Sequence, residues 1–328
     1  MSEAIDRNLA LELCRVTEAA AMMAARWMGR GDKEAADQAA VDAMRYVLGK
    51  IDMDGIVVIG EGAKDEAPML YVGERVGTGV DPKVDIAVDP IDGTRLLSLG
   101  MPNAISVVAI ADRGSMFSSP DIMYMEKIAV GPETAGVIDL NSTPSENLRR
   151  MARAKRCEVN DLTVVILDRP RHLDLISEIR AIGARIKMIS DGDVAGAVMA
   201  ATDGTGVDAL FGIGGAPEAV VAASAIKCIG GEIQCRLWPR NDQERQIAQE
   251  QNIDLRRIYR SDDLVSGSNI FFSATGITDG ELLKGVHFFG DGATTHSLVM
   301  RSRTGTVRRI EATHHISKLR SFGSIPYA

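Results

Sequence analysis

The second half of the chain repeats a strand-then-helix pattern, and this repetition constrains the fold more than any other feature. Short apolar segments suited to strands alternate with longer segments whose apolar residues recur at helical spacing. Short strands joined by such helices pair in parallel, with the helices packed on the sheet. The pattern therefore predicts an α/β layer. Its strands are expected at 162–167, 185–189 and 207–211, and its helices at 171–182, 194–201 and 217–228.

The first half mixes helices and strands without this alternation, which is typical of an α+β arrangement. Amphipathic helices are predicted at 7–28 and 33–50, from apolar stripes at helical spacing. The sequence Thr-Pro-Ser-Glu at 143–146 is a capping box that opens a basic helix at 144–155. Strands of this half are expected at 56–59, 84–88, 104–111 and 124–130.

The pattern changes near residue 150, which predicts one domain at 1–150 and a second at 151–328. An exposed helix is expected at 242–251. The last predicted strands could return to the first domain, and they lie at 269–274, 297–301 and 306–311.

The most informative single motif follows the apolar strand at 84–88 and reads Asp89-Pro-Ile-Asp-Gly-Thr94. Proline stiffens this turn, and two carboxylates three residues apart can converge on one cation beside a threonine hydroxyl. Oxygen ligands of this kind suit Mg²⁺ or Mn²⁺. The same residues also suit an ordinary turn after a strand.

Three further acids lie where a buried charge needs a partner. Asp37 is at the head of the apolar stripe of the helix at 33–50, although a place near the helix start also lets it reach water. Glu61 follows a predicted strand between two glycines, a setting that also suits a hairpin turn. Glu218 lies on the packed side of the helix at 217–228, and the helix dipole alone also accounts for an acid in its first turn.

Two short motifs follow strands of the second half. Asp191-Gly-Asp193 places two acids at a strand end, where α/β sheets line ligand crevices, and would suit sugar hydroxyls as well as a helix cap. Arg169-Pro-Arg171 places two guanidinium groups around a rigid residue, which suits a phosphate as well as a solvated turn. Weaker candidates of this kind are Tyr124, Lys127 and Arg95.

Charge and composition limit the class of partner. The net charge of −8 and the pI near 5.3 argue against nucleic acid, and no apolar run is long enough to span a membrane. Four cysteines are scattered without metal-site spacing, and Cys14 and Cys228 lie on predicted helix faces. We therefore expect buried free thiols and a cytoplasmic protein.

A nucleotide-binding regulatory protein is the alternative from another functional class. Its support is the glycine-rich link at 212–215, between a strand and a helix. As a dinucleotide fingerprint this link is weak, because the third glycine and the distal acid are missing.

The motif at 89–94 resembles the metal motif of the lithium-sensitive sugar and inositol phosphatase superfamily. More closely, nearly the whole chain resembles the class II fructose-1,6-bisphosphatases of the GlpX type. Where the wider superfamily carries Trp-Asp in its second metal segment, this chain has Pro217-Glu218, which favours the GlpX type. Ala219 departs from a frequent family glycine. The stretches that carry the resemblance are 29–37, 58–62, 65–71, 84–94, 128–132, 168–172, 191–193, 214–218 and 274–280.

The resemblance implies a five-layer αβαβα fold with a site between the two halves, and a role in gluconeogenesis. It implies five metal ligands, namely Asp37, Glu61, Asp89, Asp92 and Glu218. It implies contacts with the substrate's phosphates and sugar from Lys33, Asp92, Gly93, Thr94, Tyr124, Arg169, Pro170, Arg171, Asp191, Gly192, Asp193 and Gly215.

The expected reaction is hydrolysis of the 1-phosphate of fructose 1,6-bisphosphate, assisted by Mn²⁺ or Mg²⁺. Thr94 would position or deprotonate the water, with Asp89 or Glu61 assisting, or would itself attack the phosphorus. Sedoheptulose 1,7-bisphosphate is the alternative substrate. By resemblance we also expect a homo-oligomer, either a dimer or a tetramer.

Overall fold

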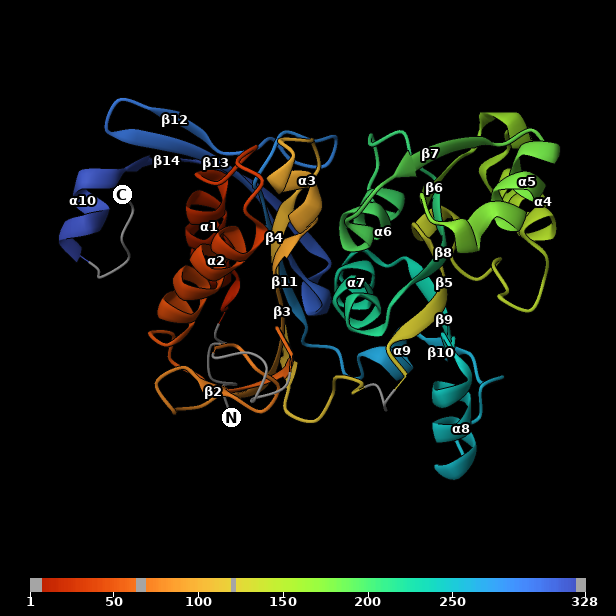
Figure 1. Ribbon diagram of the computed structural model, residues 1–328, viewed down its shortest axis with the longest axis horizontal. Coiled ribbons are helices and arrows are strands. Elements are labelled where there is room, and N and C mark those ends of the chain that lie inside the picture. The colour runs from red at the N-terminus through yellow and green to blue at the C-terminus, as the bar shows by residue number, and fades with distance from the viewer. Residues whose placement is uncertain (1–7, 63–68, 119–121, 323–328) are drawn as a thin grey trace.

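The computed structural model describes residues 8–62, 69–118 and 122–322. Within these ranges the chain forms five alternating layers of helix and sheet (Figure 1). A first sheet lies between two helix layers, and a second sheet lies between the central helices and an outer pair. The predicted α/β class and its αβαβα layering are confirmed. The helix layers are α1 (Ala10–Ala25) with α2 (Lys33–Leu48), α6 (Asp193–Ala201) with α7 (Ala216–Ile229), and α4 (Pro144–Lys155) with α5 (Leu173–Ala181).

The first sheet combines strands from both ends of the chain. Its order is β12-β13-β11-β4-β3-β1-β2, and β14 pairs with β13. Among the strand pairs of this sheet that the described residues form, only β1 and β3 run parallel to each other. Its strands are β1 (Asp54–Ile59), β2 (Arg75–Val76), β3 (Lys83–Asp92), β4 (Ile105–Asp112), β11 (Phe271–Gly276), β12 (His287–Phe289), β13 (Gly292–Arg301) and β14 (Thr306–His315).

The second sheet has the order β10-β9-β5-β8-β6-β7. Strand β6 pairs in parallel with β7 and β8, as the strand-then-helix pattern predicts. Strand β5 lies antiparallel between β8 and β9, so the sheet is mixed. Its strands are β5 (Tyr124–Val130), β6 (Thr163–Leu167), β7 (Arg185–Ile189), β8 (Ala209–Gly215), β9 (Glu232–Leu237) and β10 (Tyr259–Arg260).

Shorter helical segments connect these elements. The segment that matters for the site is α3 (Thr94–Ser98), which begins directly after the motif at 89–94. The others are α8 (Asp242–Glu250), α9 (Ser261–Leu264), α10 (Ile316–Phe322), and the 3₁₀ turns η1 (Pro132–Thr134), η2 (Val159–Asp161), η3 (Pro170–His172) and η4 (Ser302–Thr304).

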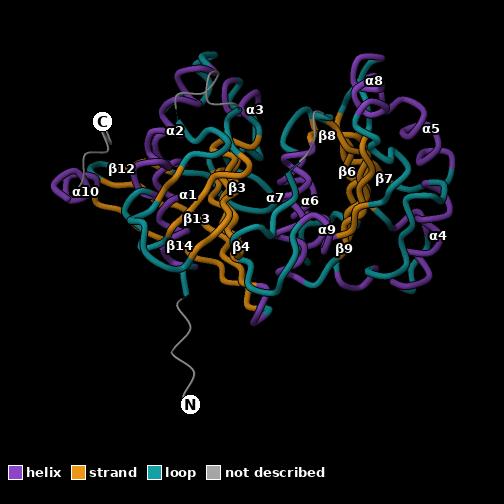
Figure 2. The backbone as a smooth tube through the Cα atoms, turned by 90° about the horizontal axis from the view of Figure 1, so that it is seen from below, coloured by secondary structure: helices purple, strands orange, loops and turns teal. Residues whose placement is uncertain are grey.

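Apolar side chains between the layers hold them together. Helix α7 lies between the two sheets in both views (Figures 1 and 2), and most of its residues from Ala219 to Cys228 are buried. A helix covered on two sides needs apolar residues around most of its circumference. Helices α1 and α2 cover the outer face of the first sheet, and α4 and α5 cover that of the second.

A buried network of hydroxyl groups joins the first helix to the C-terminal strands. The Thr17 hydroxyl on α1 lies 3.0 Å from the Ser273 hydroxyl and accepts a hydrogen bond from Thr275 Oγ1 at 2.7 Å. The Thr275 hydroxyl also lies 2.8 Å from that of Ser297 on β13. Because all these groups are buried, each needs the others as hydrogen-bond partners.

Most predicted elements are present, with ends shifted by a few residues. Strand β5, helix α4 and strand β7 have the predicted bounds, and the Thr143–Glu146 capping box is formed. The predicted helix at 171–182 is instead the turn η3 followed by α5, and the strand expected at 207–211 runs from Ala209 to Gly215. Strand β9 was not predicted, although Ile233, Cys235 and Leu237 alternate with polar residues.

The sheets distribute the chain differently from a simple cut at residue 150. Strand β5 lies in the second sheet, and β11 to β14 lie in the first. The division into domains at 1–150 and 151–328 therefore stays a prediction. The start of the helix expected at 7–28 and most of the matching stretch at 65–71 lie outside the described residues. No helix in the described ranges is long and apolar enough to cross a bilayer.

Candidate active site

The motif at 89–94 ends β3 and begins α3. In a regular strand, side chains three residues apart point to opposite faces. The pairing of β3 with β4 shifts register between Asp89 and Asp92, and such an irregularity re-aims side chains. Gly93 then takes a φ of 96°, in the left-handed region that favours glycine. The local sequence thus brings both carboxylates into one site, with Thr94 at the first position of the helix.

Thr94 lies against the acid that helix α2 supplies. Its hydroxyl is 3.2 Å from Asp37 Oδ1 and also 3.2 Å from the backbone oxygen of Ile91, and it can donate to either. Burial raises the pKa of Asp37 to about 6, while Thr94 and the nearby Lys33 lower it. Asp37 therefore remains an acceptor at neutral pH.

The two halves of the chain are joined at this point by hydrogen bonds to carboxylates. The backbone N–H of Ala195 on α6 donates to Asp92 Oδ2 at 2.7 Å. The backbone N–H of Arg95 on α3 donates to Asp191 Oδ2 at 3.2 Å. These contacts place the start of α6 against the start of α3, so Asp191, Gly192 and Asp193 face the motif at 89–94.

Burial and mutual repulsion disfavour charge on the central carboxylates. The pKa of Asp89 is raised well above its usual value, first by burial and then by the charges of Asp92 and Glu218. The pKa of Asp92 is raised by burial and by Asp193. The pKa of Glu218 is raised by the same two causes, and the charge of Lys127 opposes the rise. These acids therefore form one electrostatic unit.

Glu61 joins this unit from the end of β1. Its pKa is raised to about 7 by burial and by the charges of Asp37 and Glu218. The residue as a whole keeps a large exposed area, so water also reaches part of it. Glu61 thus connects the acid on α2 with the acid on α7.

The opposite side of the site carries positive groups from the second sheet. Arg171 donates from Nε and Nη2 to the backbone oxygen of Ile213, at 3.1 and 2.7 Å, and lies 5.2 Å from the centre of the Tyr124 ring. Arg169 Nη2 lies 3.9 Å from Asp191 Oδ1. Pro170 begins the turn η3 between the two arginines. Both guanidinium groups are therefore held by contacts that leave further N–H groups available.

A cavity of about 280 Å³ unites most of the predicted residues. Its lining combines the acids Asp89, Asp92 and Glu218 near Thr94 with Arg169 and Arg171, so it offers groups of both charge signs. Lys33, Asp37, Glu61 and Pro170 do not line it, although Asp37 contacts Thr94 at its rim. The predicted residues that do line it are Asp89, Asp92, Gly93, Thr94, Tyr124, Arg169, Arg171, Asp191, Gly192, Asp193, Gly215 and Glu218.

The five predicted metal ligands fit a hard divalent cation by their chemistry. All are carboxylates, and their mutual repulsion would be relieved by positive charge. Within the described residues Glu218 Oε2 is buried without a hydrogen-bond donor, which a cation would remedy. No three acids, histidines or cysteines in those same ranges are arranged as a ready ligand set. The distances between these carboxylates are thus longer than those between side chains that share one bound ion.

Sequence reasoning ranked one buried side chain beside the site too low. Lys127 on β5 is only 3% exposed, and its Nζ donates to Asp193 Oδ2 at 2.6 Å. Gly214 makes room for this pair, because a Cβ there would lie 1.9 Å from Asp193 Oδ2. The sequence does contain an indication of this pair, because Lys127 is followed by the apolar residues that end the strand, and a lysine there needs a buried partner.

Buried His172 also has a positional role that its sequence does not reveal. Its Nε2 accepts a hydrogen bond from the Ile213 backbone N–H at 2.8 Å, and its Nδ1 lies 2.7 Å from the Leu167 oxygen. The ring therefore joins β6 to β8 directly beside Arg171. It fixes the turn that carries the arginine pair.

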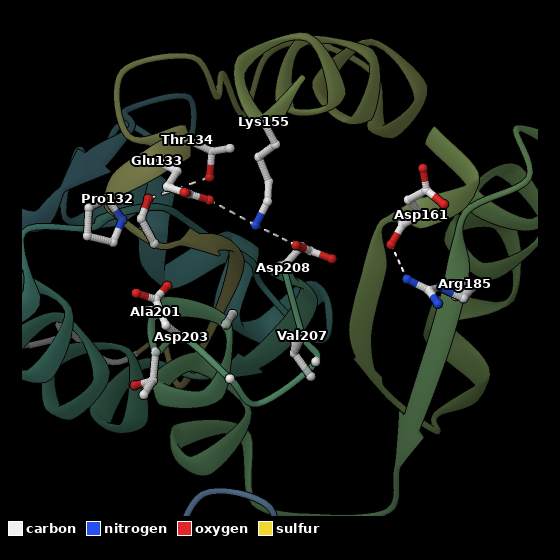
Figure 3. A pocket seen from close by; sticks show the side chains of 15 residues that line it. Pro132, Glu133, Thr134, Lys155, Asp161, Arg185, Ala201, Asp203, Val207 and Asp208 are labelled. Carbon is white, nitrogen blue, oxygen red and sulfur yellow. Dashed lines mark hydrogen bonds and ion pairs between the residues drawn. The ribbon is translucent and has the colours of Figure 1, made fainter. Parts of the chain in front are cut away.

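A second cavity, of about 330 Å³, lies near the other end of α6 (Figure 3). Lys155 projects into it, with Nζ 2.7 Å from Asp208 Oδ1 and 3.2 Å from Glu133 Oε2. None of the predicted site residues lines it. Of these two cavities, only the first is therefore lined by residues predicted from the sequence.

Comparison with known proteins gives the family. Residues 7–314 match the family described as bacterial fructose-1,6-bisphosphatase, glpX-encoded. The chain belongs to this family. The resemblance predicted from the motifs is thereby confirmed.

Curated relatives of this bacterial fructose-1,6-bisphosphatase family cover almost the full length. Fructose-1,6-bisphosphatase class 2 of Haemophilus influenzae is 47% identical over 328 residues, which cover 96% of this chain and 98% of that protein. Fructose-1,6-bisphosphatase 1 class 2 of Escherichia coli K12 is 46% identical over 325 residues, which cover 95% of this chain and 96% of that protein. The similarity thus includes both sheets and the site between them.

Proposed function

We propose that this chain hydrolyses the 1-phosphate of fructose 1,6-bisphosphate, giving fructose 6-phosphate and inorganic phosphate, as a step of gluconeogenesis. One observation carries the proposal beyond family membership. A single cavity is lined both by the acids of the motif at 89–94 with Thr94 and by the pair Arg169 and Arg171. A sugar with phosphates at both ends matches this lining, with the reacting phosphate beside the acids.

The acids of the site would hold divalent cations. Asp37, Glu61, Asp89, Asp92 and Glu218 would be the ligands, and Mn²⁺ or Mg²⁺ suits their oxygen atoms. When bound, such ions supply Lewis-acid activation of the phosphate and of water. The chain's own contribution is to hold these carboxylates rigidly, through the β3 irregularity and the Ala195 hydrogen bond to Asp92.

Thr94 would act on the attacking water. Its hydroxyl lies within hydrogen-bond distance of Asp37 Oδ1, so Asp37 can accept its proton while Thr94 accepts one from water. The water oxygen then bonds to phosphorus and the bond from phosphorus to the sugar oxygen breaks. The sugar oxygen takes a proton from solvent, and Asp37 returns its proton to solvent. Direct attack by Thr94 would instead form a phosphothreonine, which trapping and mass spectrometry would detect.

The arginine pair and its neighbours would hold the distal phosphate and the sugar. Arg169 and Arg171 suit the phosphate, and the Tyr124 ring beside Arg171 limits where that guanidinium can move. Asp191 and Asp193 would accept hydrogen bonds from sugar hydroxyls, and Gly192, Gly215 and Gly93 leave room for backbone N–H groups to approach. Lys33, at the exposed start of α2, would contact the reacting phosphate.

Phosphate release from fructose 1,6-bisphosphate tests the proposal directly. The purified protein is assayed with Mn²⁺, with Mg²⁺, and with each after addition of a chelator. We expect turnover with at least one metal and its loss with chelator. Absence of turnover by folded protein with both metals would refute the proposed function.

Two further measurements separate the alternatives. Sedoheptulose 1,7-bisphosphate is assayed in parallel, because a longer sugar with the same two phosphates presents the same charges to the cavity. Dinucleotide binding is measured by calorimetry, since a nucleotide-binding regulator would bind tightly and release no phosphate. We also propose a cytoplasmic homo-oligomer, in keeping with four free thiols.

A further inference from the structure

The outer edge of β14 is the longest open strand edge in the described part of the chain. Strand β14 is 10 residues long, pairs with β13 along its whole length, and has no strand on its other side within those residues. The other edge strands of the two sheets in those residues are β2 with 2 residues, β12 with 3, β10 with 2 and β7 with 5. A long row of unpaired backbone groups is a template for another strand.

The β14 edge lacks two of the usual obstacles to such pairing, a bulge and a proline. Its register with β13 is continuous from Thr306 to His315, without a bulge, and it contains no proline. Figure 1 places its label at the outer side of the first sheet, beside α10 and far from α6. Its charges are of both signs, with Arg309 and Glu311 on either side of Ile310.

Symmetry restricts how two copies of β14 can pair. A two-fold axis perpendicular to the sheet keeps each side chain on its own face, and directly opposite residues of antiparallel strands share a face. Residues with odd numbers must therefore lie opposite odd numbers. Only registers centred on a residue satisfy this condition.

One register stands out by its charges. Centred on Ile310, it places Arg309 of each copy opposite Glu311 of the other, giving two ion pairs related by symmetry. A register centred on Arg309 places two arginines opposite each other, and one centred on Glu311 places two glutamates opposite each other. Opposite charges across strands stabilise pairing and like charges destabilise it.

We propose that β14 joins a second copy of this chain in the Ile310-centred antiparallel register, making the first sheet continuous across a two-fold dimer. Ile310 already packs against the apolar cluster under α1 and α2, so two such residues side by side would extend that cluster across the axis. A partner of another kind would have no reason to match this self-complementary charge order.

Within the described residues, Arg309 and Glu311 have only long contacts with other side chains and backbone atoms. Arg309 Nη1 lies 3.4 Å from the Leu282 backbone oxygen, and Glu311 Oε2 lies 4.0 Å from His296 Nδ1. The side chain of Glu311 is 70% exposed. Both can therefore turn toward a partner strand without breaking a strong interaction.

Charge exchange at these two positions tests the interface. Molar mass is measured by sedimentation across a wide range of protein concentrations for wild type, Arg309→Glu, Glu311→Arg and the double variant. Each single variant places like charges opposite each other twice, and dimer dissociation should become at least about tenfold easier. The double variant restores opposite charges and should restore the dimer. Arg256→Glu, at an exposed residue of the second half, controls for the change in net charge.

The outcomes are distinct and do not depend on phosphatase activity. If wild type forms a tetramer, the single variants should reduce it to a dimer and the double variant should restore the tetramer. Circular dichroism and thermal unfolding confirm that each variant is folded. A wild-type monomer at all concentrations would overturn the proposal. So would an oligomer that the single variants leave unchanged, or one that the double variant fails to restore.

Discussion

The buried pair of Lys127 and Asp193 allows the sharpest prediction about this site. The two side chains are 3% and 9% exposed, and their charged atoms lie 2.6 Å apart. Burial lowers the pKa of Lys127, but the charges of Asp193 and Glu218 outweigh burial and raise it overall. The lysine is therefore charged at neutral pH, and it is the positive group that faces the acids from β5.

Replacing Lys127 with methionine keeps the length of the side chain and removes its charge. Asp193 would then be a buried carboxylate without its partner, next to Glu218. Breaking a buried pair in this way lowers the free energy of unfolding by about 3–5 kcal/mol. Urea unfolding followed by circular dichroism, at neutral pH and without metal, measures the change. Phosphate release by the folded fraction should also fall, because Asp193 lines the cavity.

Lys155 is the matched control. Its Nζ lies 2.7 Å from Asp208 and 3.2 Å from Glu133, but its side chain is 28% exposed and that of Glu133 is 67% exposed. Asp208 is 16% exposed, so both contacts of Lys155 are more open to water than the pair of Lys127 and Asp193. Exposed pairs contribute about 1 kcal/mol or less, so Lys155→Met should cost less than Lys127→Met. The double variant Lys127→Met/Asp193→Asn removes both charges and should recover more than half of the loss. Equal costs for the two lysine variants would refute the reasoning.

Three other predictions follow from the same electrostatics and burial. Glu61→Gln and Asp89→Asn should abolish phosphate release, and wild-type turnover in either variant would disprove the role assigned to that residue. Without metal, Asp89→Asn should unfold at or above the wild-type temperature, because the substitution removes one source of repulsion among the buried acids. The pKa of Asp37 is raised to about 6 and that of Glu61 to about 7. Protons therefore compete with cations for these carboxylates near neutral pH. The apparent affinity of the protein for Mn²⁺ should fall as the pH decreases from 8 to 6. In the same titrations a metal at 100 times its dissociation constant should stabilise the wild type by about 2.7 kcal/mol, and unchanged affinity across this pH range would contradict the argument. Burial raises the pKa of Cys14, Cys228 and Cys235 to about 12. Of the four cysteines, only the half-exposed Cys157 should therefore react rapidly with a thiol reagent in the native protein. Rapid modification of a second cysteine would contradict this prediction.

Local signals were sufficient for most secondary structure and for the acids at the strand ends. The helical spacing that placed Asp37 at the head of an apolar stripe, on the core-facing side of α2, agrees with its contact to Thr94, 57 residues away. The Thr143 capping box fixed the start of α4. These features depend on residues close together in the sequence, so the local sequence is sufficient to predict them.

Contacts between distant segments could not be read in the same way. Nothing near Tyr124–Val130 indicates that β5 lies between β8 and β9 in the second sheet. The pairing of Lys127 with Asp193, and the need for Gly214 beside them, depend on that placement. Very short elements such as α3 also gave no pattern, since a helix of 5 residues contains little more than one turn.

The return of β11 and β13 to the first sheet has a consequence for synthesis on the ribosome. Strand β4 lacks its neighbour β11 until that strand has been synthesised, on the order of 10 to 30 s later at typical rates of translation. Until then Thr17 on α1 lacks its partner Ser273, 256 residues further along the chain. The second sheet, whose strands end at Arg260, can therefore be complete first. The half of the molecule that leaves the ribosome first would then be the last to mature, and its exposed strands would depend on chaperones in the meantime.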